Sequence, residues 1–363
     1  MASRKTFPRT RSLRPLGLLA LAAAPALTAA EAPPESDFRY GIVAYHVPYP
    51  SFEIFESDLA SMAEIGINWI SVDLSWKLIE PEPDAPFDFS YFDALLGWAE
   101  KYDIQVLGKL GAGYNVERAI APEWTQDLDG EAYLAQLDEY ANATVQRYAH
   151  QIDSWGLENE INISLYHYNN NVRAQIYPED VQDRILQTLS AAVRRHDTPE
   201  AEVIMTLSPL LDWQAFLRRI EGKVDYDTVG LFHYPSIIAN QALLAPRLGD
   251  MIRDVRSVAN GRPVVVMETG YHTAGALRTE ARQALYVWLA IQATAEAGGT
   301  GIFFYHYLEN PDEPLDRQRA WGLVTLEREP KAGWLAYELA IAADLAARAA
   351  GEPATAEGEA ATP

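Results

Sequence analysis

The stretch PVVVMETG, residues 263–270, places four apolar residues directly before a single carboxylate, Glu268. A short run that is apolar throughout is typical of a strand buried on both faces in a parallel sheet. Similar β-rich runs recur along the chain, separated by segments with helical periodicity. We predict eight strands, at Tyr40–Tyr45, Asn68–Leu74, Gln105–Leu110, Ile152–Leu157, Glu202–Leu207, Thr228–His233, Pro263–Glu268 and Gly301–Tyr305.

The segments between these strands indicate helices. After Ser90, a predicted N-cap, apolar residues follow at the i, i+3, i+4, i+7 spacing, and residues 280–296 form another helix before a Gly-Gly pair. Alternating strands and helices predict an α/β fold with a parallel sheet. Eight such units favour a closed (β/α)₈ TIM barrel in a single domain. An open doubly wound sheet is disfavoured because no GxGxxG turn follows the first strand.

The two ends of the chain differ in composition from the rest. Five basic residues precede the apolar run Leu16–Leu27, and small residues follow it, with cleavage expected after Ala30 or Ala32. This layout predicts a signal peptide over residues 1–30 and a periplasmic or secreted protein. The barrel is expected over residues 37–350, and an Ala/Glu/Pro-rich, disordered tail over residues 351–363.

The charge and the cysteine count restrict the partners. The chain carries 29 Lys and Arg against 51 Asp and Glu, a net charge of −22. Removing residues 1–30 takes away five basic residues and no acidic ones, which gives −27. Such a surface is a poor partner for nucleic acid. With no cysteine and no His-rich metal motif, we expect no disulfide, metal or cofactor, no membrane association, and a monomer.

In a TIM barrel, chemistry gathers at the carboxyl ends of the strands. The fourth predicted strand ends at Glu158-Asn159-Glu160, and the seventh ends at Glu268. These two strands lie on opposite sides of an eight-stranded barrel. Their carboxylates can therefore face each other, as hydrolysis of a glycosidic bond requires. Further polar or aromatic residues at or near strand ends are Trp76, Lys109, His233, Tyr234, Tyr305 and His306.

Three motifs resemble the clan A glycoside hydrolases, including the cellulase-like family 5 and the family 39 enzymes. They are Trp155 to Asn162 around Asn159-Glu160, Phe232-His233-Tyr234, and Val264 to Tyr271 around Glu268. The resemblance implies that Glu160 is the acid/base, that Asn159 holds the sugar 2-hydroxyl, and that Glu268 is the nucleophile. It also implies that Tyr234 hydrogen-bonds the nucleophile. The activity it implies is retaining hydrolysis of β-glycosidic bonds in an oligo- or polysaccharide.

Two departures from that pattern affect the site. Many clan members carry Arg on the second strand, where this chain has Ser71, and we expect Lys109 to supply the missing positive charge. The eighth strand commonly ends in a Trp that floors the sugar site, whereas this chain has Tyr305-His306. Either of these two residues could form the floor, and Trp76 is a further candidate for stacking on a sugar ring.

Other interpretations remain open at the level of sequence. Glu158 competes with Glu160 for the acid/base role, because residues two apart on a strand share a face. A non-catalytic carbohydrate-binding barrel is the main alternative, and the absence of the strand-two Arg supports it. An aldolase that forms a Schiff base on Lys109 is a third possibility. The sequence does not reveal the sugar, the linkage, or the choice between endo and exo action.

Overall fold

The computed structural model describes residues 37–44, 54–111, 122–163, 179–210, 212–234, 242–309 and 320–350. The chain divides into two units, residues 1–35 and residues 36–363, and everything described lies in the second. The predicted signal peptide and the predicted C-terminal tail fall outside the described residues, so both stay predictions.

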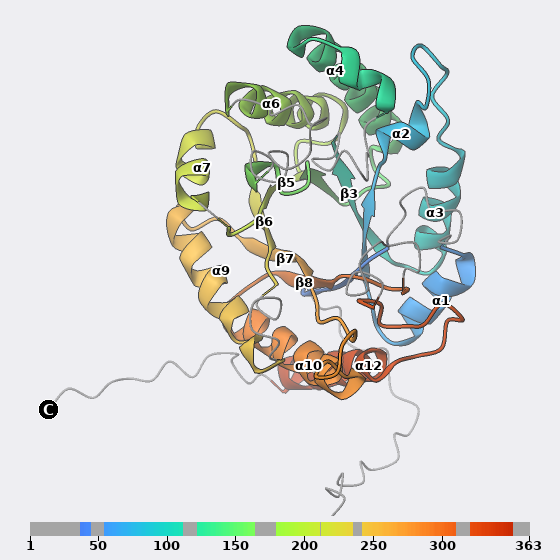
Figure 1. Cartoon of the computed structure of the whole chain (residues 1–363), viewed down its shortest axis with the longest axis vertical. Helices are drawn as coiled ribbons and strands as arrows, with labels where there is room; N and C mark the ends of the chain where they lie inside the picture. Colours follow the sequence, from blue (N-terminus) through green and yellow to red (C-terminus); the bar gives the residue numbers. More distant parts are fainter. Residues whose placement is uncertain are drawn as a thin grey trace, which may run out of the picture. The chain divides into compact units, whose positions relative to one another are not determined.

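Eight parallel strands close into a barrel in the order β1 to β8, with β1 paired to β8 (Figure 1). This confirms the predicted (β/α)₈ fold. The strands are β1 (Arg39–Val43), β2 (Trp69–Asp73), β3 (Gln105–Leu110), β4 (Ser154–Leu157), β5 (Glu202–Leu207), β6 (Thr228–Phe232), β7 (Val264–Thr269) and β8 (Gly301–Phe304). The predicted bounds of β3 and β5 agree with the structure, and those of the other strands differ by one or two residues at an end.

Helices surround the barrel (Figure 1). The α-helices are α1 (Glu56–Glu64), α2 (Trp76–Ile79), α3 (Ser90–Lys101), α4 (Gly130–Tyr148), α6 (Glu179–His196), α7 (Trp213–Ile220), α9 (Arg247–Val258), α10 (Glu280–Glu296) and α12 (Ala332–Ala349). Short 3₁₀ helices are η2 (Glu123–Asp127), η3 (Ile161–Ile163) and η5 (Ala242–Leu244).

The start of α3 corrects one prediction. Ser90 is the first residue of the helix and not its N-cap, which is Phe89. The Asp88 carboxylate accepts a hydrogen bond from the backbone N–H of Ser90 at 2.9 Å. A carboxylate at this point satisfies an N–H group that has no partner within the helix. The N-cap therefore lies one residue earlier than predicted, and the carboxylate of Asp88, one residue before it, satisfies the first N–H group.

Two glycines make room inside the barrel for long side chains. A Cβ on Gly230 would lie 2.1 Å from Sδ of Met267, and a Cβ on Gly156 would lie 3.0 Å from Cγ of Lys109. Since a barrel interior is a packed core, a long side chain can cross it only where a neighbouring strand presents no side chain. Gly156 thus leaves space for the aliphatic part of Lys109.

The pairing register aligns the ends of neighbouring strands. Asp73 of β2 pairs with Lys109 of β3, and Lys109 pairs with Gly156 of β4. On the far side, Phe232 of β6 pairs with Glu268 of β7, after a register shift that follows Leu231. The register therefore puts Asp73 and Lys109 side by side at the carboxyl end of the barrel.

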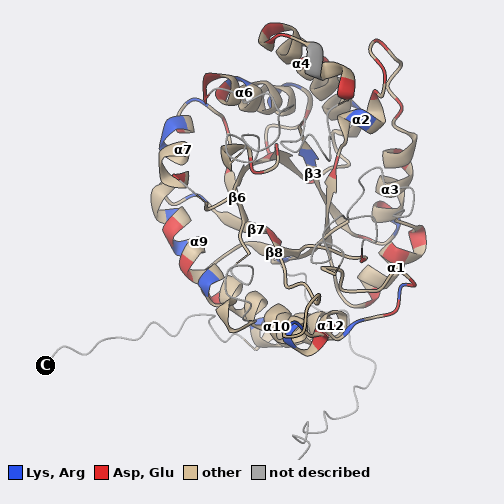
Figure 2. Cartoon of the chain, viewed as in Figure 1, with Lys and Arg blue, Asp and Glu red and all other residues tan. Residues whose placement is uncertain are grey.

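The outer helices carry the charges. Figure 2 shows acidic and basic residues interspersed along α9, whereas the charged residues of α7 are basic, Arg218 and Arg219. Within the described ranges, no helix is long and apolar enough to span a membrane. The same ranges contain no group of three or more His, Asp or Glu side chains that could hold a metal ion.

Candidate active site

Glu268 ends the apolar run of β7 and is 8% exposed. Its two carboxylate oxygens have different partners. The Lys109 ammonium donates to Oε1 at 3.1 Å, and the Tyr234 hydroxyl donates to Oε2 at 2.9 Å. Burial raises the pKa of Glu268, while the charge of Lys109 and the hydrogen bond from Tyr234 oppose that rise. The site therefore holds a buried carboxylate whose anionic form is supported from two sides.

Lys109 is 5% exposed and contacts three other elements of the barrel end. Besides Glu268, its ammonium lies 2.7 Å from Oδ1 of Asp73 and donates to Oδ1 of Asn159 at 3.1 Å. Burial alone would lower the pKa of Lys109, but the two carboxylates outweigh it and raise that pKa. Lys109 is accordingly a permanent cation beside Glu268. The structure thus brings together the two residues that the sequence analysis linked.

The backbone changes direction immediately after β4. Glu158 and Glu160 both have left-handed backbone conformations, with φ values of 58° and 51°. Left-handed φ is uncommon for a residue with a side chain and costs about 1–3 kcal/mol at a position of this kind. The expectation that Glu158 and Glu160 share a strand face is wrong, because the strand has ended at Leu157.

The two glutamates consequently occupy different environments. Glu158 is buried and packs against Gly111, where an added Cβ would lie 2.8 Å from its carboxyl carbon. Glu160 and Asn159 are half-buried. Of the two carboxylates, Glu160 is therefore the more accessible to a ligand.

His233 and Tyr234 follow β6 directly and flank Glu268. The backbone N–H of His233 donates to the Glu268 carbonyl at 3.0 Å. Burial, together with the charge of Arg247, lowers the pKa of His233 to about 4, so its ring is neutral at physiological pH. Burial and the neighbouring Glu268 raise the pKa of Tyr234 far above its ordinary value, and Glu160 contributes in the same direction. Tyr234 is thus a hydroxyl donor within electrostatic reach of both glutamates.

Aromatic rings pack beside this donor. The ring centroid of Tyr234 lies 5.3 Å from that of Trp321 and 6.3 Å from that of Tyr305. Trp321 also contacts His272, with centroids 5.1 Å apart. Tyr305 is half-buried, whereas Trp321 is buried behind it. Tyr305 therefore has surface left for a ligand, as does the half-buried Tyr234.

Two predicted substrate-binding residues, Trp76 and His306, are buried. Trp76 is fully buried, stacks on Tyr140 with centroids 5.2 Å apart, and donates its indole N–H to Glu80 at 2.8 Å. His306 is also fully buried, one residue after Tyr305 and joined to it by a cis peptide bond. Since neither side chain has an exposed face, we assign neither of them to direct contact with a sugar. Both residues lie at or near the end of a predicted strand, but their side chains are buried.

Asp73 is the residue whose importance sequence reasoning missed. Asp73 lies near the end of the second predicted strand, Asn68–Leu74, but belongs to none of the three motifs. Its pairing with Lys109 across β2 and β3 was the signal available, because both residues lie at the carboxyl ends of consecutive strands. Tyr45, the last residue of the first predicted strand, lies outside the described residues.

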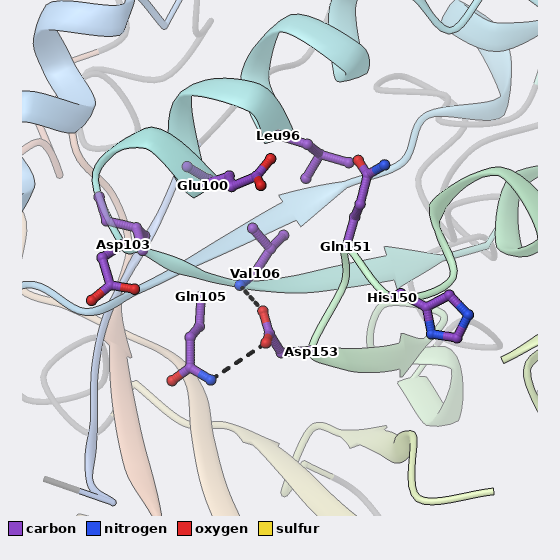
Figure 3. Close-up of a pocket in the computed structure, with 10 residues that line it drawn as sticks. Leu96, Glu100, Asp103, Gln105, Val106, His150, Gln151 and Asp153 are labelled. Atoms are coloured by element: carbon purple, nitrogen blue, oxygen red, sulfur yellow. Dashed lines mark hydrogen bonds between the residues drawn. The ribbon is translucent and has the colours of Figure 1, made fainter. Parts of the chain in front are cut away.

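Two hollows lie at the opposite end of the barrel. One, of about 340 Å³, is lined by residues around the starts of β3 and β4, where Asp153 accepts hydrogen bonds from Val106 and Gln105 (Figure 3). The other, of about 610 Å³, is lined by Arg39, Trp69, Glu202 and neighbouring residues. Strand starts in such barrels serve stability, whereas chemistry belongs to the carboxyl ends. The candidate site is therefore the Glu268 end.

In comparisons with known proteins, the chain is similar to glycoside hydrolases, in agreement with the resemblance seen in the sequence. The glycoside hydrolase 42 family model, described as beta-galactosidase, matches residues 46–161, less than half of the chain. A 6-phospho-beta-glucosidase of Dickeya chrysanthemi is 24% identical over 186 residues, which cover 47% of this chain and 37% of that relative. The matched region thus spans well under two thirds of that relative.

Solved structures agree on the fold. The GH5_18 protein of Streptomyces cattleya, in complex with GlcNAc, superposes with a TM-score of 0.71 at 16% identity, covering 84% of this chain and 80% of that chain. A family 39 glycoside hydrolase from Bacteroides cellulosilyticus gives a TM-score of 0.59 at 17% identity, covering 84% and 64%. At these identities the likeness establishes the barrel, and it does not assign a substrate.

Proposed function

We propose that this chain is a retaining β-glycoside hydrolase that acts on an oligo- or polysaccharide by double displacement. One observation carries the proposal. A buried carboxylate, Glu268, is held at one oxygen by the Lys109 ammonium and at the other by the Tyr234 hydroxyl. Burying an anion is costly unless it is paired, and this pairing opposes the rise in the pKa of Glu268 at the barrel end where chemistry occurs. A nucleophile requires those conditions.

In the first step, a Glu268 oxygen attacks the anomeric carbon while the bond from that carbon to the leaving oxygen breaks. Glu160 delivers its proton to the leaving oxygen, so the aglycone departs as an alcohol. In the second step, Glu160 removes a proton from water, and the resulting oxygen nucleophile displaces Glu268 from the sugar. Two inversions give net retention, and both glutamates return to their starting states.

The other site residues serve these two steps. The Tyr234 hydroxyl stays protonated and orients Oε2 of Glu268, leaving the other oxygen beside Lys109. Asn159 offers its side-chain amide to a sugar hydroxyl, and Tyr305 offers an aromatic face. The His233 ring is neutral and therefore adds no second cation to the site.

The two rival functions are weaker on physical grounds. A binding-only barrel was favoured by the absence of a strand-two Arg, but the Lys109 ammonium lies 3.1 Å from Glu268 in its place. A Schiff-base aldolase requires an uncharged lysine amine, usually obtained by a lowered pKa. Here the pKa of Lys109 is raised, which opposes that chemistry.

The test is covalent labelling by a 2-fluoro β-glycoside carrying an activated leaving group. We expect one sugar per chain, attached to Glu268 and located by mass spectrometry of peptides. The Glu268→Gln variant should take up no label and hydrolyse none of the wild-type substrates. Hydrolysis retained by Glu268→Gln would overturn the proposal, and sugar binding without label or turnover would favour the binding-only barrel.

The substrate is best sought among β-glycosides. Relatives are named for β-galactoside and 6-phospho-β-glucoside hydrolysis, and one structural neighbour holds GlcNAc. We therefore propose a first screen of aryl β-galactoside, β-glucoside, β-mannoside and N-acetyl-β-glucosaminide, followed by glucans, mannans, xylans and galactans. The stereochemistry of the first product, observed by NMR, separates retention from inversion.

We also propose export to the periplasm or the medium, on the basis of the basic and apolar segments before Ala30. N-terminal sequencing of the mature protein should begin at Glu31 or Pro33. A mature protein that begins at Met1 or Ala2 would contradict export through this segment.

A further inference from the structure

Three side-chain oxygen atoms lie within 3.1 Å of the Lys109 ammonium, one as an ion-pair partner and two as hydrogen-bond acceptors. A lysine ammonium carries three N–H donors and no acceptor. Its three neighbours are Asp73 at 2.7 Å, Asn159 at 3.1 Å and Glu268 at 3.1 Å, from β2, the end of β4 and β7. The Lys109 ammonium, on β3, therefore contacts side chains from β2, from the turn after β4 and from β7.

The contact with Asn159 fixes which way its amide points. An ammonium can only donate, so it must face the amide oxygen of Asn159 and not the amide nitrogen. The oxygen is indeed the atom at 3.1 Å. The Asn159 NH₂ group is thereby directed away from Lys109 and is left as a donor for a ligand. Lys109 thus determines the orientation of the side-chain amide of Asn159, the residue next to Glu160.

Asp73 makes the shortest of the three contacts. It lies directly beside Lys109 in the β2–β3 register and is largely buried. Two residues earlier on the same strand face, the Ser71 hydroxyl is buried without a hydrogen-bond partner among the described residues. In this chain β2 therefore contributes an anion to the site, and the cation comes from β3.

We propose that Asp73 is a positioning residue, which holds the Lys109 ammonium between Asn159 and Glu268 and thereby fixes the donor orientation of Asn159 and the charge facing the nucleophile. The proposal rests on the proposed function of Glu268. It assigns to Asp73 no contact with the substrate and no part in proton transfer. Its effects on turnover pass entirely through Lys109.

The charge around Glu268 makes the proposal measurable. The groups that face it are Lys109 and Asp73 on one side and Tyr234 on the other, with Glu160 and Tyr305 near Tyr234. Asp73 shares the charge of Lys109 with Glu268. The Asp73 carboxylate also repels Glu268 and raises its pKa. Replacing Asp73 by neutral Asn removes this repulsion and leaves the Lys109 charge to Glu268, so the Glu268 pKa should fall. Removing the cation with Lys109→Met should raise it.

The experiment measures the Glu268 pKa directly, so that it does not depend on turnover. Carboxyl ¹³C resonances of labelled glutamate are titrated in the wild type, Asp73→Asn, Lys109→Met and Lys109→Arg, and the Glu268 signal is assigned by its loss in Glu268→Gln. The matched control is Asp183→Asn on α6, another largely buried aspartate paired with cations, Arg219 and Lys223, outside the barrel.

We expect the Glu268 pKa to fall in Asp73→Asn, to rise in Lys109→Met, and to stay at the wild-type value in Lys109→Arg and Asp183→Asn. With an aryl glycoside that the enzyme hydrolyses, the acidic limb of the pH profile of kcat/KM should shift in the same directions. That limb reports the pKa of the nucleophile in the free enzyme. Asp73→Ala, which removes the acceptor, should lower kcat by roughly 10²-fold with little change in KM.

An unchanged or raised Glu268 pKa in a folded Asp73→Asn variant would overturn the positioning role. If the wild type takes up no fluoro-sugar label while the pKa values shift as expected, the proposed hydrolase function fails and the linkage between Asp73, Lys109 and Glu268 stands. Each of the two proposals can therefore be contradicted without contradicting the other.

Discussion

At the scale of the residue, a single ammonium group in the site contacts several polar side chains. A guanidinium binds carboxylates in a planar, two-pronged arrangement, whereas an ammonium is a point charge with three rotatable donors. Lys109 can therefore contact Asp73, Asn159 and Glu268 from a single nitrogen atom. Its buried position makes each of these contacts stronger than it would be in water.

Replacing the acid/base residue should separate substrates by their leaving groups. For Glu160→Ala we expect kcat on an alkyl β-glycoside to fall by roughly 10²–10⁴-fold, because general acid catalysis contributes that much. An activated aryl glycoside needs no protonation and should lose far less in the first step. Added azide, which replaces the water that needs a general base, should restore turnover and yield a β-glycosyl azide. An equal loss on both substrates would contradict this role for Glu160.

The neutral His233 ring makes stability dependent on pH. Its pKa is about 4 in the folded protein and 6.5 when unperturbed, so the unfolded chain binds more protons between these values. The stability from the neutral ring is therefore fully present above pH 6.5 and is lost as the pH falls towards 4. In His233→Gln, we expect Tm to fall less between pH 7 and pH 5 than in the wild type. The same substitution at His196, on α6, serves as the control.

At the scale of the element, the end of β4 decides how the site is presented. The strand stops at Leu157, and the left-handed residues Glu158 and Glu160 turn the chain before η3. This turn separates a buried glutamate from an accessible one. The stem of Lys109 reaches the same region only because β4 has no side chain at Gly156.

Gly156→Ala tests that dependence. The added Cβ would lie 3.0 Å from Lys109 and 3.2 Å from Met267, so one of these side chains must move. We expect a loss of stability of about 1–3 kcal/mol, as for other overpacked cores, and a lower kcat. The comparison is Gly97→Ala in α3, where a Cβ meets nothing within 4 Å and the position is exposed.

Gly97→Ala should instead stabilise the protein by about 0.5–1 kcal/mol, because alanine loses less backbone entropy in a helix. Urea unfolding measures both variants, and kcat should change only in Gly156→Ala. If kcat is unaffected in Gly156→Ala, the position of the Lys109 ammonium does not depend on the absence of a side chain at residue 156.

At the scale of the whole molecule, the chain combines a net charge of −22 with the absence of any cysteine. Repulsion among like charges destabilises the compact state, and salt screens it. Raising sodium chloride from about 10 mM to about 1 M shortens the Debye length from about 30 Å to about 3 Å. We therefore expect Tm to rise over this range, and to rise equally in potassium chloride. A fall in Tm would mean that the ion pairs outweigh the repulsion.

The sequence by itself determined the barrel and the strand ends. Apolar runs of four to six residues must be buried on both faces, and their alternation with helices leaves few arrangements. Residues that end such runs then meet at one end of the barrel, which is how Glu268 and Lys109 were found from local pattern alone.

Only the tertiary structure decided which of the strand-end side chains keep an exposed surface. Trp76 and His306 satisfy the same local pattern as Tyr305, but their environments bury them completely. The grouping of Asp73, Asn159 and Glu268 around one ammonium likewise depends on register and on the gap at Gly156. These features come from contacts between strands far apart in sequence, and no local pattern of residues specifies such contacts.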